Sequence, residues 1–552
     1  MKKLVSILLA LTVVLSLCVG CGGNKANGDK PGVGADGKVT LTVGVAESAT
    51  VVSWEQNALT KWLEEQCNVT LKFLPYPGGT DVATQISTTV AARQELPDIL
   101  WGINLGNEVA STYGRDGYFV NLSTYLEEDK EGAGKTFWDR MSLFNEEELA
   151  NFLRRMRSPY DGNIYGLPTI EYSPTDSMKY QLWINTEWLD KVGMDKPTNT
   201  DELYEVLVAF KNTDCTGNGD TKDEIPLFGT QRADAGCRIV DWLINLFLYY
   251  NDDHRWQDYN GDGQLEFVYV QDQYREALKF VNKLYKEGLI GDVVWTTSSD
   301  KCKSITTPST GVPICGIFAG HLTIHVQRES ELVYKYEALP TWGCAVANDY
   351  GFNLASFITT DCDYPDKAFE VLMTMFSEEG SRRIRYGEKG VNWDEPDEGA
   401  MSAYGIPAEY KLISDPLGTQ NAQNWTKVAC TVNYYAEGES AQIAEGMSQW
   451  EKDKNLWHAE QRKMFDEAAA ANNPEFIAPV LQTTAEEAEE YEMIRTNIYD
   501  LGAKAETEFI TGTGGRDINN DAHWAEFVSK MEEMGMYDYQ ALMNKILERQ
   551  TN

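Results

Sequence analysis

The chain has 552 residues, of which 42% are hydrophobic, and this is enough apolar sequence for more than one folded core. Its 85 acidic residues against 48 basic residues give a formal net charge of −37 at pH 7. Such a field repels nucleic acids and anionic surfaces, so we exclude nucleic-acid binding and favour a neutral ligand over an anionic one.

The first residues have the pattern of a secretory signal. Two lysines follow Met1, and the apolar run after them is too short to span a membrane as a helix. A glycine precedes Cys21 and two glycines follow it, which resembles a bacterial lipobox, although Cys18 stands where leucine is usual. We therefore predict a signal peptide over 1–20, a lipid on Cys21 and a flexible tether over 21–38, with secretion without a lipid as the alternative.

The next segments alternate between strand and helix patterns. We predict strands at 39–45, 70–74 and 98–101, and helices at 53–66 and 80–93. This alternation is typical of a doubly wound sheet, in which ligands lie at the carboxyl ends of the strands. Those ends carry Glu47, Trp101 and Asn104, and Trp54 opens the helix after the first strand. We therefore expect these side chains to line a cleft, while the alternative for each tryptophan is ordinary core packing.

A break between two strand patterns indicates that the chain crosses from one lobe to another. Residues 166–172 must be extended, because Pro168 keeps its predecessor out of the helical region. The chain then turns through 173–176 and continues as a second strand over 179–184. Glu171 and Tyr172 therefore lie at the crossing, and Trp183 lies in the strand that enters the second lobe.

An oxygen-rich loop follows the next helix, which begins after Pro197 with Thr198 or Thr200 as its cap. From Asp214 to Glu224, oxygen-bearing side chains occur at alternate positions with a glycine at the sixth. This pattern suits either a calcium ion or a solvated turn. A second acidic loop, Asp258–Glu266, lacks the bidentate glutamate that closes an EF-hand loop, and we predict a hairpin turn there.

The remaining chain completes both lobes. We predict helices at 239–249, 273–288 and 366–382, strands at 314–318 and 352–358, and helix-rich sequence beyond about residue 398 that packs on the second lobe. Trp295 lies in a loop, and Trp342 lies next to the return of the chain to the first lobe. The eight cysteines outside the signal are scattered, so we expect mostly unpaired, buried thiols.

Three motifs resemble the large lipid-anchored extracellular solute-binding proteins of carbohydrate ABC importers, the group that includes the alginate-oligosaccharide binders. The motifs are Trp183–Gly193, the capped helix after Pro197, and Gly217-Asn218-Gly219 followed by Asp223–Pro226. The resemblance implies a two-lobed, periplasmic-binding-protein-like (type II) α/β fold with a helix-rich C-terminal extension. It implies a first lobe of 39–171 and 340–395 and a second lobe of 172–339 and 396–552, with hinges near 171–176, 336–342 and 387–396.

The resemblance also implies that the oxygen-rich loop binds one structural Ca²⁺. The implied ligands are Asp214, Thr216, Asn218, the carbonyl of Asp220, Asp223 and Glu224. The loop departs from the family at Thr216, where asparagine is usual, and by one extra residue before Asp223.

Enzyme signatures are absent from the sequence: there is no Walker A motif, no G-x-S-x-G elbow and no HExxH motif. We predict a monomeric, non-catalytic receptor on the extracellular face of the membrane that captures an oligosaccharide and delivers it to an ABC permease. Sugar rings stack on aromatic side chains, and their hydroxyls bind planar polar groups. The predicted ligand-binding residues are Trp54, Trp101, Trp183, Trp295, Trp342, Tyr172, Glu47, Asn104 and Glu171. The alternatives are a peptide receptor of the same fold and a secreted polysaccharide hydrolase or lyase.

Overall fold

The computed structural model describes most of the chain after the first 31 residues. The described residues are 32–34, 37–48, 51, 53–77, 82–172, 180–230, 238–250, 255–291, 294, 301–322, 326, 331–339, 342–345, 351–402, 405–414, 431–434, 440–446, 453 and 463–551. The predicted signal peptide and Cys21 lie outside them, as do Trp295 and most of the predicted tether. Within this described part, no helix is both long and apolar enough to cross a membrane.

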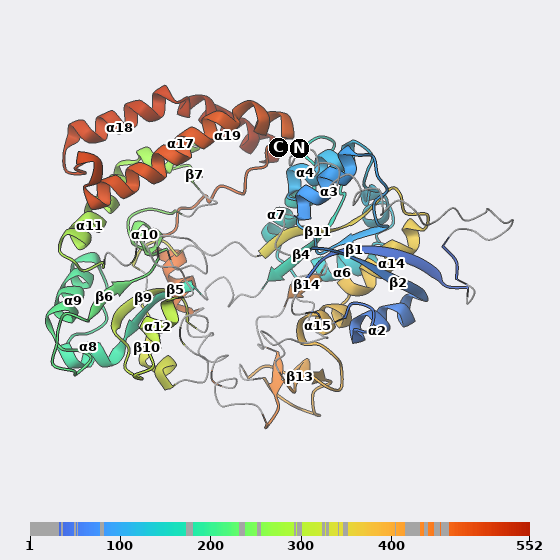
Figure 1. Cartoon of the computed structure of the whole chain (residues 1–552), viewed down its shortest axis with the longest axis horizontal. Coiled ribbons are helices and arrows are strands. Elements are labelled where there is room, and N and C mark those ends of the chain that lie inside the picture. Colours follow the sequence, from blue (N-terminus) through green and yellow to red (C-terminus); the bar gives the residue numbers. More distant parts are fainter. Residues whose placement is uncertain are drawn as a thin grey trace, which may run out of the picture.

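A six-stranded sheet forms the centre of the first lobe, on the right of Figure 1. In spatial order its strands are β14 (Thr431–Tyr434), β4 (Leu167–Tyr172), β11 (Gly351–Ile358), β3 (Ile99–Trp101), β1 (Val39–Ala46) and β2 (Val69–Tyr76). β11 runs antiparallel to both of its neighbours, and the other pairs are parallel. Five strands therefore end at one edge of the sheet, and the same edge holds the start of β11.

Helices cover this sheet and share one apolar core with it. They are α2 (Ala58–Cys67), α3 (Val82–Ala91), α4 (Asn107–Arg115), α5 (Ser123–Leu126), α6 (Lys135–Met141), α7 (Glu146–Met156), α14 (Pro365–Phe376) and α15 (Glu378–Tyr386). The buried core draws on residues 41–170 and 352–384 only. The chain therefore leaves this lobe after β4 and returns to it at β11.

A four-stranded sheet forms the centre of the second lobe. Its strands, in spatial order, are β10 (Tyr336–Ala338), β5 (Tyr180–Asn185), β9 (Cys315–His321) and β6 (Ile225–Phe228). The elements around it are α8 (Thr186–Val192), α9 (Thr200–Asn212), α10 (Ile239–Ile244), β7 (Trp256–Gln257), β8 (Glu266–Phe267), η3 (Val268–Val270), α11 (Asp272–Lys286), α12 (Cys302–Thr306) and η6 (Glu331–Lys335). Its core is separate from the first and also includes residues between 478 and 546.

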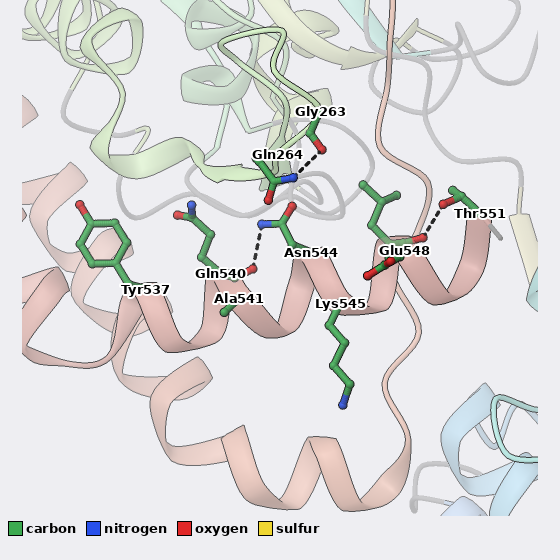
Figure 2. A pocket seen from close by; sticks show the side chains of 10 residues that line it. Gly263, Gln264, Tyr537, Gln540, Ala541, Asn544, Lys545, Glu548 and Thr551 are labelled. Carbon is green, nitrogen blue, oxygen red and sulfur yellow. Dashed lines mark hydrogen bonds between the residues drawn. The ribbon is translucent and has the colours of Figure 1, made fainter.

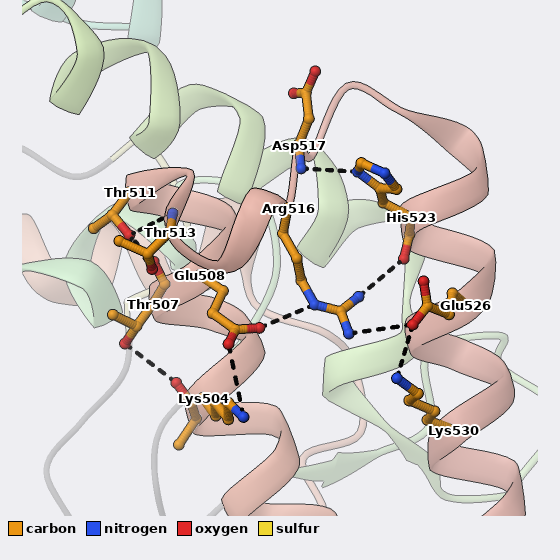
Figure 3. A network of polar contacts seen from close by, with 11 residues as sticks. Lys504, Thr507, Glu508, Thr511, Thr513, Arg516, Asp517, His523, Glu526 and Lys530 are labelled. Carbon is orange, nitrogen blue, oxygen red and sulfur yellow. Dashed lines mark hydrogen bonds and ion pairs between the residues drawn. The ribbon is translucent and has the colours of Figure 1, made fainter.

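Three helices near the C-terminus complete the second core. They are α17 (Ala485–Thr511), α18 (Asp521–Glu533) and α19 (Met536–Thr551), with the short η7 (Thr513–Gly515) after α17. Figure 3 shows how the turn between α17 and α18 is held: Arg516 Nε donates to Glu508 Oε2 at 3.0 Å, and Arg516 lies 3.7 Å from Glu526. The prediction that closing helices pack on the second lobe is confirmed.

The C-terminal helices also contact the first lobe. Arg115 on α4 forms an ion pair with Glu486 on α17 at 2.8 Å, and the amide of Ala485 donates to the Tyr160 hydroxyl at 2.6 Å. The Gln482 side chain donates to the carbonyl of Arg155 at 3.3 Å. The start of α17 therefore joins the two lobes outside the predicted crossings.

The segment after residue 396 differs from the expectation that it lies wholly with the second lobe. Residues 431–434 form β14, which extends the first sheet beside β4. A small sheet of β12 (Trp393–Asp394), β13 (Tyr410–Leu412) and β15 (Ala441–Ile443) has its own buried cluster, which includes Tyr386 of α15. Backbone pairing with β4 is a long-range interaction that local sequence patterns do not reveal.

Several helix ends differ from the predicted ones because asparagine and serine side chains cap them. α2 begins at Ala58, since the Asn57 side chain accepts the amide of Leu59, and α9 is capped by Asn199 rather than by Thr198 or Thr200. α10 stops at Ile244, where the Asn245 side chain accepts the amide of Tyr250. The predicted helix over 366–382 is two helices, because Ser377 ends α14 and caps α15.

Candidate functional site

The carboxyl edge of the first sheet presents exposed polar side chains. Glu47 follows β1, and its amide donates to the carbonyl of Tyr76 at the end of β2 at 2.8 Å. Asn104 follows β3; its amide nitrogen donates to Asn353 Oδ1 at 2.9 Å, and its own Oδ1 accepts the Gly106 amide at 3.0 Å. Both asparagines are exposed. This edge therefore offers amide and carboxylate groups that can bind the hydroxyls of a polar ligand.

Asn353 is a site candidate that the sequence analysis missed. It lies near the start of β11, opposite Thr169 on β4, and Gly351 pairs with Glu171 in the same register. Because β11 runs against its neighbours, its first residues reach the edge where the other strands end. Only the antiparallel pairing of β11 reveals this, and a strand pattern alone gives no direction.

Trp101 and Trp54 lie in the core beneath this edge rather than open to a cleft. Trp101 is 0% exposed, and its ring centroid lies 5.9 Å from that of Phe73. Trp54 is also buried, and its ring stacks on that of Phe73 with the two ring centroids 5.6 Å apart. Both indoles are packed in the core of the first lobe. The expectation that Trp101 points into a cleft is therefore wrong.

Trp183 is a core residue of the second lobe. It is 2% exposed, and its indole nitrogen donates to the carbonyl of Gly320 on the neighbouring strand at 2.7 Å. Its position in β5, between Phe318 and Ala338, surrounds the ring with protein. The structure therefore gives Trp183 a packing role where a stacking platform was predicted.

Trp342 is the predicted aromatic residue that the structure leaves half-buried. It packs against the second core close to Asn245, whose carbonyl accepts the Cys344 amide at 2.7 Å. Its indole N–H is buried and has no acceptor among the described residues. Trp295 lies outside the described residues, and so do the side chains of Glu171 and Tyr172.

In the second sheet, the start of β5 lies at the same edge as the ends of its neighbouring strands. β5 begins at Tyr180, and Tyr180 pairs with His321 at the end of β9, to which β6 runs parallel. The carboxyl ends of β6 and β9 therefore lie at the same edge of this sheet as the start of β5. β4 of the first sheet ends at Tyr172, and β5 of the second sheet begins at Tyr180.

The oxygen-rich loop is folded around Asp214. Its carboxylate accepts the amides of Gly217 at 2.6 Å, Asn218 at 3.0 Å and Gly219 at 2.8 Å. These backbone donors, with Gly219 the largest contributor, lower the pKa of Asp214. Gly217 and Gly219 both have positive φ, 79° and 88°, which favours glycine at these positions.

Glu224 closes the loop from inside and retains one unsatisfied oxygen. The side chain is 7% exposed, and Oε1 accepts the Thr216 hydroxyl at 3.1 Å, while Oε2 is buried without a partner. Asn218 donates to Asp223 at 2.6 Å. Carboxylate, hydroxyl and amide oxygens are the ligand types that calcium takes. A buried carboxylate oxygen without a donor is costly unless a cation is bound, so the donor set fits calcium. Among the described residues, no three Asp, Glu, His or Cys side chains are close enough to hold a metal by themselves.

The second acidic loop is a hairpin, as predicted. β7 and β8 pair antiparallel on either side of it, and Asp258 accepts the amides of Gly261, Asp262 and Gly263 at 2.6, 3.1 and 2.8 Å. Asn544 on α19 fixes the loop by accepting the Leu265 amide at 2.7 Å. Figure 2 shows the groove of about 760 Å³ between this loop and α19, which second-lobe residues line without any contribution from the first lobe.

The described cysteines are free thiols, as predicted. They are Cys67, Cys215, Cys302, Cys315, Cys344 and Cys362. Five of them are buried, and burial raises the pKa of the Cys362 thiol to about 12. Cys237 and Cys430 lie outside the described residues.

Residues 47–307 match the bacterial extracellular solute-binding protein family. A fructooligosaccharide ABC transporter substrate-binding protein, FusA, of Streptococcus pneumoniae is 37% identical over 150 residues, which are 26% of this chain and 27% of that protein. A polygalacturonan/rhamnogalacturonan-binding protein, YtcQ, of Bacillus subtilis is 24% identical over 323 residues, 58% of this chain and 56% of that protein. The chain thus matches between about a quarter and just over half of the length of these curated relatives.

Solved structures share the fold over nearly the whole chain. FusA of S. pneumoniae in complex with kestose has a TM-score of 0.69 at 21% identity and covers 92% of this chain and 99% of its own. A solute-binding protein of Bifidobacterium longum infantis, described as HMO-binding and ABC-transporter-associated, has a TM-score of 0.73 at 19% identity, with 93% and 99% covered. The chain therefore has the two-domain fold of these solute-binding proteins, and its residues 47–307, just under half of the chain, are similar to the bacterial extracellular solute-binding protein family.

Proposed function

We propose that this chain is the cell-surface, substrate-binding lipoprotein of an ABC importer, and that it captures an oligosaccharide between its two lobes. The observation that carries the proposal is the carboxyl edge of the first sheet, which presents Glu47, Asn104 and Asn353 to solvent. Ligands of open α/β sheets bind at such strand ends. The proposed lobes are 39–171 with 340–395, and 172–339 with 396–552, except that Trp342 packs against the second core and β14 lies in the first sheet.

The chemistry of this edge suits a neutral sugar. Asparagine amides both donate to and accept from hydroxyls, and Glu47 accepts from them, so the three side chains can bind several hydroxyls at once. The buried indole N–H of Trp342 supplies a further donor from the second lobe. The name of FusA, a fructooligosaccharide ABC transporter substrate-binding protein, supports an oligosaccharide as the ligand.

The proposed receptor is anchored through a lipid on Cys21 and passes its ligand to a permease as a monomer. The lipobox-like sequence supports the anchor, and the lipoprotein LipO of B. subtilis is 32% identical over 174 residues. Closure of two lobes around a ligand by hinge motion would give the permease a state to recognise. The solute-binding relatives favour a receptor over a catalyst.

The proposed Ca²⁺ is structural. Asp214, Thr216, Asn218, the carbonyl of Asp220, Asp223 and Glu224 would hold it, and it would tie the end of α9 to the start of β6. The buried Oε2 of Glu224 supports this set. A FusA EF-hand mutant and an alginate-binding protein described without its calcium ion are among the solved structures with this fold.

Calorimetric titration of the purified chain tests the ligand class. We expect heat from a neutral oligosaccharide, with one ligand per chain, and none from uncharged peptides of similar length. The rival peptide receptor requires the reverse result, and a chain that responds to neither ligand contradicts the proposed function.

A further inference from the structure

A groove of about 730 Å³ lies on the first lobe, and none of Glu47, Asn104 and Asn353 lines it. Its walls come from α2, α5, α6, α14 and the start of α15, and no residue of the second lobe lines it. Figure 1 shows α2 and α14 on the side of this lobe that faces away from the second. The groove is therefore distinct from the proposed sugar site.

The floor of the groove is apolar and aromatic. Trp62, Tyr125, Phe369 and Met373 contribute to it, and the rings of Tyr125 and Phe369 are stacked with centroids 4.5 Å apart. Trp62 is half-buried. Such a floor can hold an apolar or aromatic side chain of a partner.

The rim of the groove is acidic. Asp129, Asp366, Glu370 and Glu379 line it, and no lysine, arginine or histidine does. Lys367 pairs with Glu370 at 2.6 Å, and Arg383 with Glu379 at 2.8 Å. Among the described residues, no cation pairs with Asp129 or Asp366. Asp129 accepts the Ala133 amide and Asp366 accepts the Tyr125 hydroxyl, so both carboxylates are held in place beside the apolar floor without a cationic partner among the described residues.

At one edge of the groove, an arginine of the chain contacts both an aromatic ring and a carboxylate. The guanidinium of Arg383 lies 4.9 Å from the centre of the Trp62 ring while it bonds to Glu379. A cation held between an aromatic face and a carboxylate is a favourable arrangement. Asp366 lies beside the stacked Tyr125 and Phe369 rings, and its Oδ1 accepts the Tyr125 hydroxyl at 2.7 Å. A lysine or arginine of another molecule can therefore make the same pair of contacts beside Asp366.

We propose that this groove docks a segment of a partner protein that presents an apolar side chain flanked by lysine or arginine. The charge complementarity at Asp129 and Asp366 and the aromatic floor select this occupant over an anionic or a neutral one. That the partner is the membrane permease rests on the proposed function, whereas the chemistry of the groove does not.

The test uses the full chain and a short, fluorescently labelled peptide of alternating lysine and phenylalanine, followed by anisotropy. The variant is Asp129→Asn with Asp366→Asn, which keeps side-chain shape. The matched control is Asp190→Asn with Asp195→Asn, two exposed acidic residues of the second lobe. We expect the groove variant to weaken peptide binding about fivefold or more, and the control to leave it unchanged.

Three results would overturn the proposal: equal weakening by both variants, tight binding of the same peptide with glutamate in place of lysine, or equally tight binding of spermidine, which has charge but no apolar side chain. Oligosaccharide affinity is measured on both variants. Unchanged sugar affinity with weakened peptide binding supports the groove, whereas a parent chain that binds the peptide but no oligosaccharide counts against the proposed function and not against the groove.

Discussion

Glu224 is the residue on which the calcium assignment depends. A free cation that binds only the folded chain stabilises it by about 2.7 kcal/mol at a hundred times its dissociation constant. Glu224→Gln removes the buried charge that the ion would neutralise. We therefore expect calcium to raise the melting temperature of the parent chain and to have little effect on the variant.

Glu187→Gln is the control, because Glu187 is an exposed carboxylate of the same lobe that pairs with Lys335 away from both acidic loops. It should leave the calcium-dependent rise in melting temperature intact. If the parent chain melts at the same temperature with calcium and with a chelator, the loop around Asp214 is a turn and not a metal site.

Trp101 tests whether the aromatic residues at strand ends are core or ligand contacts. Because the indole is fully buried against Phe73, Trp101→Ala leaves a cavity and should lower the free energy of unfolding by about 3–5 kcal/mol. Urea denaturation measures this directly. A loss below about 1 kcal/mol would mean that the ring is not packed as the structure shows.

Trp342 should behave in the opposite way. Trp342→Phe keeps an aromatic ring and removes an N–H that has no acceptor among the described residues, so the free energy of unfolding should not fall. If that N–H binds a sugar hydroxyl, oligosaccharide affinity should drop about threefold to tenfold. Equal sugar affinity in the variant and the parent would remove Trp342 from the site.

For single residues, the sequence predicts which polar side chains lie at the sheet edge better than it predicts whether an aromatic side chain is buried. Glu47 and Asn104 could be predicted because residues that directly follow a strand lie at the edge of its sheet. Whether Trp101 or Trp183 faces a cleft or a core could not, since that depends on which side of the strand the neighbouring helices cover.

At the scale of elements, α17 is attached to the second lobe through a buried carboxylate. Glu506 is 3% exposed; it pairs with Arg238 and accepts the Tyr274 hydroxyl at 2.7 Å. Burial, and then the charge of Glu506, raise the pKa of Tyr274 well above its usual value. The carboxylate thus joins three segments that are distant in sequence.

Glu506→Ala should therefore lower the free energy of unfolding by about 3–5 kcal/mol, because it leaves the buried Arg238 with one carboxylate partner fewer. Glu508→Ala is the control on the same helix: its partner Arg516 lies at the turn in Figure 3, so its loss should cost about 1 kcal/mol or less. Similar losses for both variants, measured by denaturation, would contradict the assignment of Glu506 as the attachment of α17.

Element patterns were readable from the sequence where one face is apolar, as in β1, α9 and α11. Their ends were less so, because asparagine caps such as Asn57 and Asn199 are recognised only when the neighbouring turn is known. β14 was missed for another reason: its pairing with β4 joins residues more than 250 positions apart, and no local pattern predicts the partner of a short strand.

At the scale of the whole molecule, the break between 172 and 180 and the sequence motifs of Trp183–Gly193 were sufficient to predict two α/β lobes. The structure adds what they could not: the start of α17 links the lobes through Arg115 and Glu486, and Asn353 joins the polar edge because β11 is antiparallel. These features arise from contacts between distant segments. The proposal that the two lobes hold one oligosaccharide and leave it intact also concerns the whole molecule.

Native mass spectrometry of the chain with a neutral oligosaccharide tests whether the lobes hold one oligosaccharide and leave it intact. We expect a complex of one chain with one oligosaccharide, whose mass is unchanged after release. Because a receptor binds without altering covalent bonds, prolonged incubation should give the same mass. Release of shorter products would show a hydrolase or lyase, and the absence of any complex with oligosaccharides, together with a complex with peptides, would contradict the account.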